Sequence, residues 1–142
     1  MTAVEFHILS EAGAEARWRH TCALVEQAQL ADEKVFIRAE ADALQRLDDL
    51  LWTFRDQAFI PHEHANANSP SHARIAALLG CNEPLPPGYS VLINLHGTAP
   101  VQLDQAAKVI EVVDADATVK QQARERYKQY REQGCQLETI NY

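Results

Sequence analysis

The N-terminal part of the chain shows two kinds of hydrophobic spacing in turn. Residues 5–9 (EFHIL) and 34–39 (KVFIRA) are short apolar runs rich in β-branched and aromatic side chains, so both are predicted strands. Between them the apolar positions recur with helical spacing, at Ala14, Trp18, Cys22, Val25 and Ala28. A strand, a helix and a strand in this order predict a parallel βαβ unit and a layered α/β architecture.

The rest of the chain also alternates between helical and strand-like patterns. The predicted helices are 40–52, 101–107 and 116–133. The predicted strands are 90–95, 109–113 and 136–140. Residues 74–79 fit a strand or a helix, and the polar residues 62–72 predict a loop. Because no repeat or linker divides the sequence, we expect one domain over residues 1–142.

Composition narrows the class of protein. The 142 residues include 13 Lys and Arg, 20 Asp and Glu, and three cysteines, which suits one hydrophobic core. Cys22, Cys81 and Cys135 are odd in number and far apart, which argues against a disulfide framework and favours a reducing compartment. Acidic residues interrupt the start of the chain and no long uncharged apolar run occurs. We therefore expect a cytoplasmic protein without a signal peptide or membrane span.

The charge is unevenly distributed along the chain. A net charge of −7 argues against wrapping duplex DNA, yet residues 117–131 hold five basic residues and one acidic residue. On the last predicted helix an apolar stripe is formed by Val119, Ala123, Tyr127 and Tyr130. One residue later follows a cationic stripe of Lys120, Arg124, Lys128 and Arg131. An apolar surface bordered by guanidinium groups predicts a site for an acidic peptide that ends in an aromatic residue.

Two other interpretations of this helix stay open. In the first, the cations form a solvated face, partly compensated by Glu125 and Glu132. In the second, Tyr127 and Tyr130 stack on the bases of single-stranded DNA while the cations contact phosphates, an interpretation that the net charge disfavours.

Enzymatic chemistry has only weak support. The five glycines are isolated from one another, so no phosphate-binding loop is predicted. His62, Glu63 and His64, with His72 nearby, have the composition to bind zinc or activate a water molecule. The alternative hypothesis for function is therefore a small metal-dependent or nucleotide-handling enzyme that uses the loop with His62 and His64. Cys81, which follows Gly80, is the nearest candidate for a catalytic nucleophile but a poor one, because no G-x-S-x-G motif occurs and an isolated cysteine is more often a buried structural residue.

A group of large apolar side chains follows the helix predicted at 40–52. Its members are Leu51, Trp52, Phe54, Phe59 and Ile60. We expect most of them in the core. An exposed member would mark a protein contact, since tryptophan is enriched among the residues that dominate interface energetics.

Several short motifs, taken in order, form a combined signature. They are Leu47-Asp48, Leu51-Trp52, Phe59-Ile60-Pro61-His62, residues 91–95 (VLINL), residues 111–114 (EVVD), residues 123–128 (ARERYK), Tyr130-Arg131 and Gly134. With these motifs the sequence resembles the chi subunit family of bacterial DNA polymerase III over nearly its whole length.

The resemblance implies a noncatalytic accessory subunit of the clamp-loader complex, without a cofactor or metal. The fold it implies is a three-layer α/β/α Rossmann-like domain with a mostly parallel, mixed sheet. One surface of the family binds the acidic C-terminal tail of the single-stranded-DNA-binding protein (SSB), which ends in phenylalanine. The tail-binding residues expected here are Lys120, Arg124, Tyr127, Arg131, Leu137 and Thr139.

A second surface of the family binds the psi subunit, which leads to the clamp-loader motor, and competitively a helicase of the iron–sulfur type. Trp52 and Phe59 match the positions used there, and Leu51, which directly precedes Trp52, is expected to contribute as well. We therefore expect protein partners, no sequence-specific nucleic-acid binding and no membrane contact.

Overall fold

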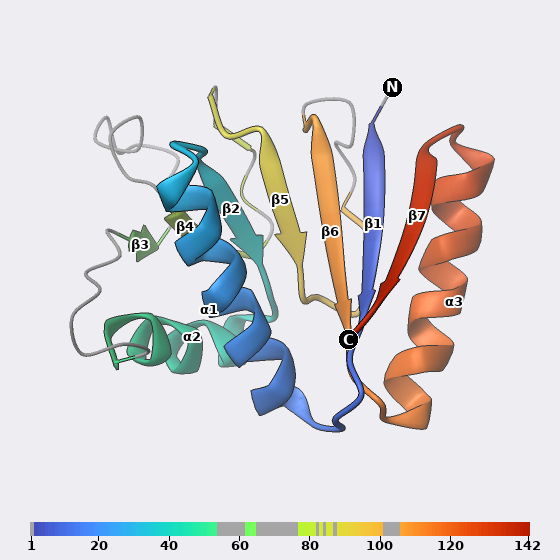
Figure 1. Ribbon diagram of the computed structural model, residues 1–142, viewed down its shortest axis with the longest axis horizontal. Helices are drawn as coiled ribbons and strands as arrows, with labels where there is room; N and C mark the ends of the chain where they lie inside the picture. The colour runs from blue at the N-terminus through green and yellow to red at the C-terminus, as the bar shows by residue number, and fades with distance from the viewer. Residues whose placement is uncertain are drawn as a thin grey trace.

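The computed structural model describes residues 2–53, 62–64, 77–81, 83, 85–86, 88–100 and 106–142. These residues form one α/β fold (Figure 1). Its elements in chain order are β1 (Ala3–Ile8), α1 (Ala14–Leu30), β2 (Val35–Arg38), α2 (Ala41–Thr53), β3 (His62–His64), β4 (Ala77–Gly80), β5 (Val91–Asn94), β6 (Lys108–Val113), α3 (Ala117–Glu132) and β7 (Gln136–Asn141). No helix in the described part of the chain is long and apolar enough to cross a membrane.

All the described strands belong to one sheet, in the order β3-β4-β2-β5-β6-β1-β7. Every neighbouring pair is parallel, which confirms the predicted α/β fold. The sheet is more regular than the mixed one that the resemblance implied, since the described strands include no antiparallel pair. Parallel strands need crossover connections, and α1, α2 and α3 each provide one.

The helices cover both faces of the sheet and divide the core in two. On one face α1 and α2 contribute Cys22, Val25, Leu47 and Leu51 to a large apolar cluster. On the other face α3 contributes Ala123 and Tyr130 to a second cluster. The strands β2, β4 and β5 are buried along their whole length, as expected when both faces of a parallel sheet are covered.

Two segments differ from the sequence predictions. Residues 62–64, which were predicted as loop, form the edge strand β3, paired in parallel with β4. The loop prediction is wrong there because backbone hydrogen bonds to a neighbouring strand do not depend on side-chain polarity. The ambiguous residues 74–79 overlap a strand, β4. Of the helix predicted at 101–107, residues 101–105 lie outside the described residues, and 106 and 107 are not helical.

The helix α3 begins and ends as its sequence predicts. The Asp116 side chain accepts hydrogen bonds from the backbone N–H groups of Thr118 (2.9 Å) and Val119 (3.2 Å), which caps the N-terminus. After the last turn, Gly134 adopts a φ of +81°, a conformation that glycine accepts at little cost. Both ends of the basic helix are therefore fixed locally.

A pair of histidines joins β1 to α1 beside the C-terminus. The Glu5 carboxylate lies 3.0 Å from His7 Nε2, so this nitrogen carries the proton and donates. His7 Nδ1 then accepts from His20 Nε2–H at 2.9 Å, and the Tyr142 ring packs against both imidazoles. Burial, together with the nearby His7, lowers the pKa of His20 from 6.5 to about 4.

This depressed pKa predicts a loss of stability in mild acid. The folded protein holds His20 neutral, whereas the unfolded chain protonates it below about pH 6.5, so stability falls as the pH drops from 6.5 towards 4. Between pH 7 and pH 5 we expect the free energy of unfolding to fall by about 1–2 kcal/mol because of this group. Urea titrations of the wild type and of His20→Gln, whose amide does not titrate, measure the difference. An equal loss in both proteins would contradict the assignment.

Candidate functional site

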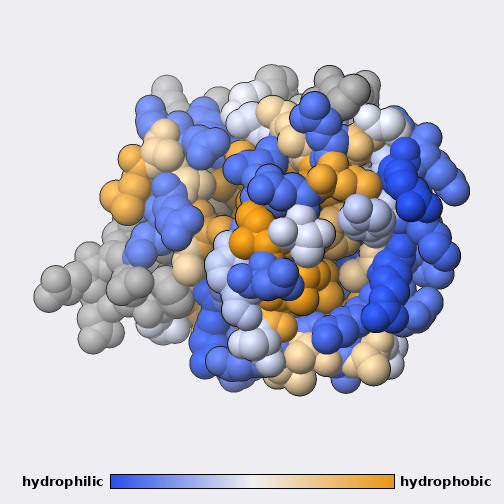
Figure 2. Space-filling view, turned by 45° about the vertical axis from the view of Figure 1, so that its right-hand side comes forward, coloured by the Kyte–Doolittle hydropathy of each residue, from blue (hydrophilic) through white to orange (hydrophobic). Residues whose placement is uncertain are grey.

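A hollow of about 270 Å³ lies between α3 and the sheet. Its lining residues are Phe6, Ile8, Val113, Lys120, Ala123, Arg124, Tyr127 and Thr139, and together they define the α3 hollow. The helix provides the two cations and an aromatic ring, and the strands β1, β6 and β7 provide the opposite wall. Figure 2 brings the α3 side of the molecule forward. It shows a band of hydrophilic side chains along the right-hand edge, with apolar side chains gathered beside it.

The floor of the α3 hollow is aromatic and aliphatic. The Tyr127 ring is half-buried, with its centroid 5.3 Å from that of Phe6, and the two rings are tilted by 55°. Ala123 is buried on the same helix face, one turn before Tyr127, and its small side chain leaves room above the sheet. The hollow can therefore accept an apolar side chain without displacing a charged group.

Two cations border this apolar floor. Lys120 is half-buried and Arg124 is exposed, and neither forms an ion pair with the described residues. Arg124 only donates a long hydrogen bond to the Gln121 side chain, at 3.4 Å. By contrast Lys128, one turn further along, lies 4.0 Å from the Glu125 carboxylate. Uncompensated cations beside an apolar hollow suit a ligand that joins a carboxylate to an aromatic or aliphatic group.

The structure brings together four of the six residues predicted for tail binding, namely Lys120, Arg124, Tyr127 and Thr139. Arg131 is exposed in the last turn of α3 and Leu137 packs against the core at the start of β7, so neither lines the hollow. Sequence reasoning missed the wall residues Phe6, Ile8 and Val113. The alternation of side chains along β1 was a signal for two of them, because it places Phe6 and Ile8 on the same face of the strand. The structure pairs Phe6 with Thr139, which brings this face to the hollow.

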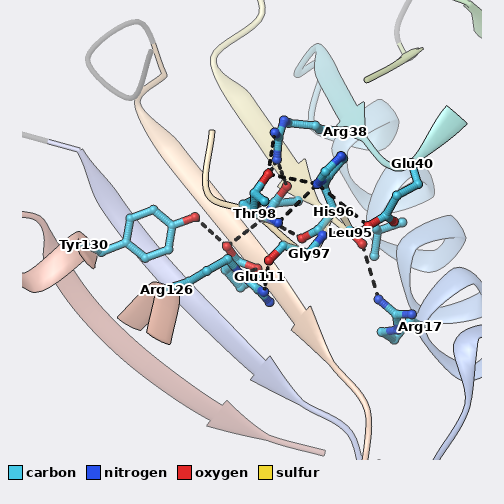
Figure 3. Close-up of polar contacts among 11 residues, drawn as sticks. Arg17, Arg38, Glu40, Leu95, His96, Gly97, Thr98, Glu111, Arg126 and Tyr130 are labelled. Atoms are coloured by element: carbon cyan, nitrogen blue, oxygen red, sulfur yellow. Dashed lines mark hydrogen bonds and ion pairs between the residues drawn. The ribbon is translucent and has the colours of Figure 1, made fainter. Parts of the chain in front are cut away.

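A buried polar cluster lies beneath α3, next to the hollow (Figure 3). At its centre is Glu111 of β6, which is 0% exposed. Its carboxylate accepts hydrogen bonds from Arg126 Nε at 3.1 Å, from Asn94 Nδ2 at 2.9 Å and from the Tyr130 hydroxyl. These four residues are the Glu111 cluster. Burial raises the pKa of Glu111, which Arg126 opposes, and burial beside this carboxylate also raises the pKa of Tyr130.

Arg126 was grouped with the basic residues of 117–131 in the sequence, but its side chain points into the protein and is 6% exposed. A buried arginine needs a charged partner. The sequence offered one signal of such a partner, because Glu111 is the only acidic residue in the apolar run 109–113.

Three arginines also hold the loop that follows β5. Arg17 donates to the carbonyl of Leu95 at 3.3 Å, Arg126 to that of Gly97 at 3.0 Å, and Arg38 to that of Thr98 at 2.6 Å. These arginines come from α1, α3 and β2, so the loop is tied to both faces of the sheet.

The second predicted surface is described only in part. Trp52 is 51% exposed near the C-terminal end of α2, whereas Leu51 is 1% exposed and belongs to the core. The prediction that Leu51 contributes to a contact surface is therefore wrong, because successive residues of a helix point in different directions. Phe54, Phe59 and Ile60 lie outside the described residues.

The histidine segment is described only in part, and its described residues form no metal site. Among the described residues no group of three or more His, Cys, Asp and Glu side chains could hold a metal ion. His64 is exposed on β3, but the side chains of His62 and Glu63, and all of His72, lie outside the described part of the chain. The enzymatic interpretation of this segment stays a prediction.

Comparison with solved structures finds a similar fold in the crystal structure of T4 UvsW, with a TM-score of 0.66 and 10% sequence identity. The match covers 99% of this chain and 42% of the UvsW chain. At this level of identity the likeness shows the fold alone.

Sequence comparisons give closer relatives. The chain is 36% identical over 140 residues to the DNA polymerase III subunit chi of Pseudomonas aeruginosa, covering 97% of this chain and 95% of the relative. For the subunit chi of Haemophilus influenzae the identity is 31% over 140 residues, covering 96% and 95%. For that of Escherichia coli it is 26% over 131 residues, covering 92% and 88%.

A family model described as DNA polymerase III chi subunit, HolC, matches residues 1–138. Together with these relatives, the match shows that the chain belongs to the chi subunit family of DNA polymerase III, accessory subunits that take part in DNA replication.

Proposed function

We propose that this protein is a noncatalytic adaptor that joins SSB to the clamp loader of DNA polymerase III. The observation that carries the proposal is the α3 hollow, where Lys120 and Arg124 border an apolar floor without ion-pair partners among the described residues. This is the chemistry that an acidic peptide with a C-terminal phenylalanine requires.

In the proposed complex the aromatic side chain of the tail enters the α3 hollow beside Tyr127. The terminal carboxylate and the acidic side chains lie against Arg124 and Lys120. Because Arg124 is exposed, water and salt screen this attraction, so a single contact is of modest affinity. Several SSB tails and a tethered clamp loader raise the effective concentration, and weak contacts then suffice.

The geometry does not favour direct binding of single-stranded DNA by α3. A stacking platform needs an accessible ring face, but Tyr130 is 0% exposed and Tyr127 packs on Phe6. The tyrosines therefore support a hollow for one apolar group better than a track for successive bases.

A second surface, on the side of α2, is proposed for the psi subunit, or for a helicase of the iron–sulfur type that competes with psi. Trp52, half-exposed near the end of α2, is its described member, and Phe59 remains an expected one. Trp52 lies on α2, which covers one face of the sheet, whereas the α3 hollow lies on the opposite face, so the two partners do not compete for one site (Figure 1).

The tail-binding proposal predicts that Arg124→Ala weakens binding of a labelled SSB tail peptide by about tenfold or more. Such a loss corresponds to one charge-assisted hydrogen bond of about 1.5–3 kcal/mol. Lys120→Ala should act in the same direction, and wild-type affinity should fall as salt rises. Fluorescence anisotropy at low and high salt measures these effects.

The matched control is Lys128→Ala, which removes the same charge from the same helix at a position outside the hollow. Its affinity should stay within about twofold of the wild type, since it loses only a remote charge. If Lys128→Ala and Arg124→Ala weaken binding equally, the tail follows the charge of the helix rather than the hollow.

For the second surface we expect Trp52→Ala to weaken binding of a cognate psi subunit by at least about 2 kcal/mol, because exposed tryptophans are frequent hot spots. The control is Leu30→Ala, which truncates an apolar side chain that is 85% exposed at the end of α1. Calorimetric titration of psi into each variant measures the effect. Unchanged binding by Trp52→Ala would remove Trp52 from the psi surface, and tail binding should be unaffected by either variant.

A further inference from the structure

A row of side chains crosses the sheet on the face that α3 covers. In the strand register, Arg38 of β2 is level with Asn94 of β5, which is level with Glu111 of β6. The same row continues through Phe6 of β1 to Thr139 of β7. Residues level across a parallel sheet share a face, so this row runs from a buried polar part directly into the wall of the α3 hollow.

The polar part of the row is joined by hydrogen bonds. Arg38 donates to Asn94 Oδ1 at 3.0 Å, and Asn94 donates to Glu111 Oε2 at 2.9 Å. Asn94 is thereby oriented by both neighbours, with its oxygen towards the guanidinium and its nitrogen towards the carboxylate. The position of the Glu111 carboxylate is therefore determined by the sheet before α3 contributes to it.

The helix is attached to this carboxylate at two points one turn apart. Arg126 Nε donates to Glu111 Oε1 and the Tyr130 hydroxyl donates to Oε2, while Arg126 Nη1 donates to the Gly97 carbonyl (Figure 3). Two directional contacts to opposite oxygens of one carboxylate, with a third to a separate loop, fix both the rotation of α3 about its axis and its position along that axis.

The residues of the hollow lie next to these attachment points. Tyr127 directly follows Arg126 in the helix, and Arg124 comes two residues before it. The Phe6 ring contacts Tyr127, with centroids 5.3 Å apart, and also Tyr130, at 5.9 Å. A rotation of α3 by one residue would move Arg124 and Tyr127 together away from the hollow.

Apolar packing alone does not determine the rotation and position of α3 on the sheet. Apart from Tyr130, the helix presents small or half-buried residues to the sheet, namely Val119, Ala123 and Tyr127. A buried ion pair adds little net stability compared with apolar residues of similar volume, because desolvating two charges offsets their attraction. Directional hydrogen bonds differ from apolar contacts because they form in only one alignment of the helix on the sheet.

We propose that Glu111 and Arg126, with Tyr130, are positioning residues of the tail-binding site. They hold α3 in the one register in which Arg124, Lys120 and Tyr127 form the α3 hollow with β1 and β7. This inference rests on the proposed function, and it assigns the affinity for the acidic peptide partly to residues that the peptide does not touch.

The test is the double variant Glu111→Met/Arg126→Met, which replaces both charged groups of the ion pair by unbranched apolar side chains. We expect it to fold with a somewhat lower denaturant midpoint than the wild type, because the ion pair itself adds little net stability while the buried Tyr130 hydroxyl loses its acceptor. We also expect it to bind the labelled tail peptide about five- to tenfold more weakly at both low and high salt, because binding groups must be held within a fraction of an ångström. Nuclear Overhauser contacts between the Phe6 and Tyr127 rings should weaken as well, a change that a purely stabilising pair would not produce.

A folded double variant with wild-type affinity and intact Phe6–Tyr127 contacts would overturn the positioning role and leave the tail site itself in place. Failure of the wild type to bind the peptide would instead overturn the proposed function, and the positioning role with it.

Tyr130→Phe decides the matter if the double variant does not fold, since it removes one hydroxyl and keeps the ring. We expect this variant to stay folded and to bind the peptide at least about twofold more weakly, with its salt dependence unchanged. Wild-type affinity in folded Tyr130→Phe would count against the proposal.

Discussion

The structure on the α3 side depends on one constraint, the burial of the Glu111 carboxylate inside a parallel sheet. Removing such a group from water costs several kcal/mol unless charged and polar donors surround it. Three donors do so, and two of them, Arg126 and Tyr130, come from the same helix. The observed packing of α3 on this sheet brings both side chains to the carboxylate.

That constraint also determines which charges reach the surface. Arg126 forms its ion pair with Glu111 inside the protein. The cations that α3 presents at the surface are therefore Lys120, Arg124, Lys128 and Arg131. Two of them, Lys120 and Arg124, border the α3 hollow, and Lys128 has Glu125 beside it. Lys120 and Arg124 therefore place positive charge at the hollow of an acidic protein, whereas Arg131 is exposed outside it, and positive charge at the hollow favours an anionic ligand.

The sequence predicted most of this fold and four residues of the α3 hollow, for identifiable reasons. Helical spacing on α3 separated the apolar stripe from the cations, so Arg124 and Tyr127 could be assigned to one surface. The spacing did not separate the buried Arg126 from its exposed neighbours, because a partner on a distant strand decides its direction. For the same reason the opposite wall of the hollow, from Phe6 to Val113, was missed, since it depends on strand order rather than local pattern.

In open α/β sheets ligands commonly bind at the carboxyl ends of the strands. In this protein three arginines at that end, Arg17, Arg38 and Arg126, donate hydrogen bonds to backbone carbonyls of the loop after β5. These N–H groups are therefore already used by the chain's own backbone and are not free to bind a phosphate. The sequence also has no glycine-rich turn whose backbone N–H groups could bind a phosphate instead. The binding site that we propose lies instead on the flank of the sheet, between α3 and the strands β1 and β7. In this proposal binding depends on a few side chains of the α3 hollow and on the buried Glu111 carboxylate that aligns them.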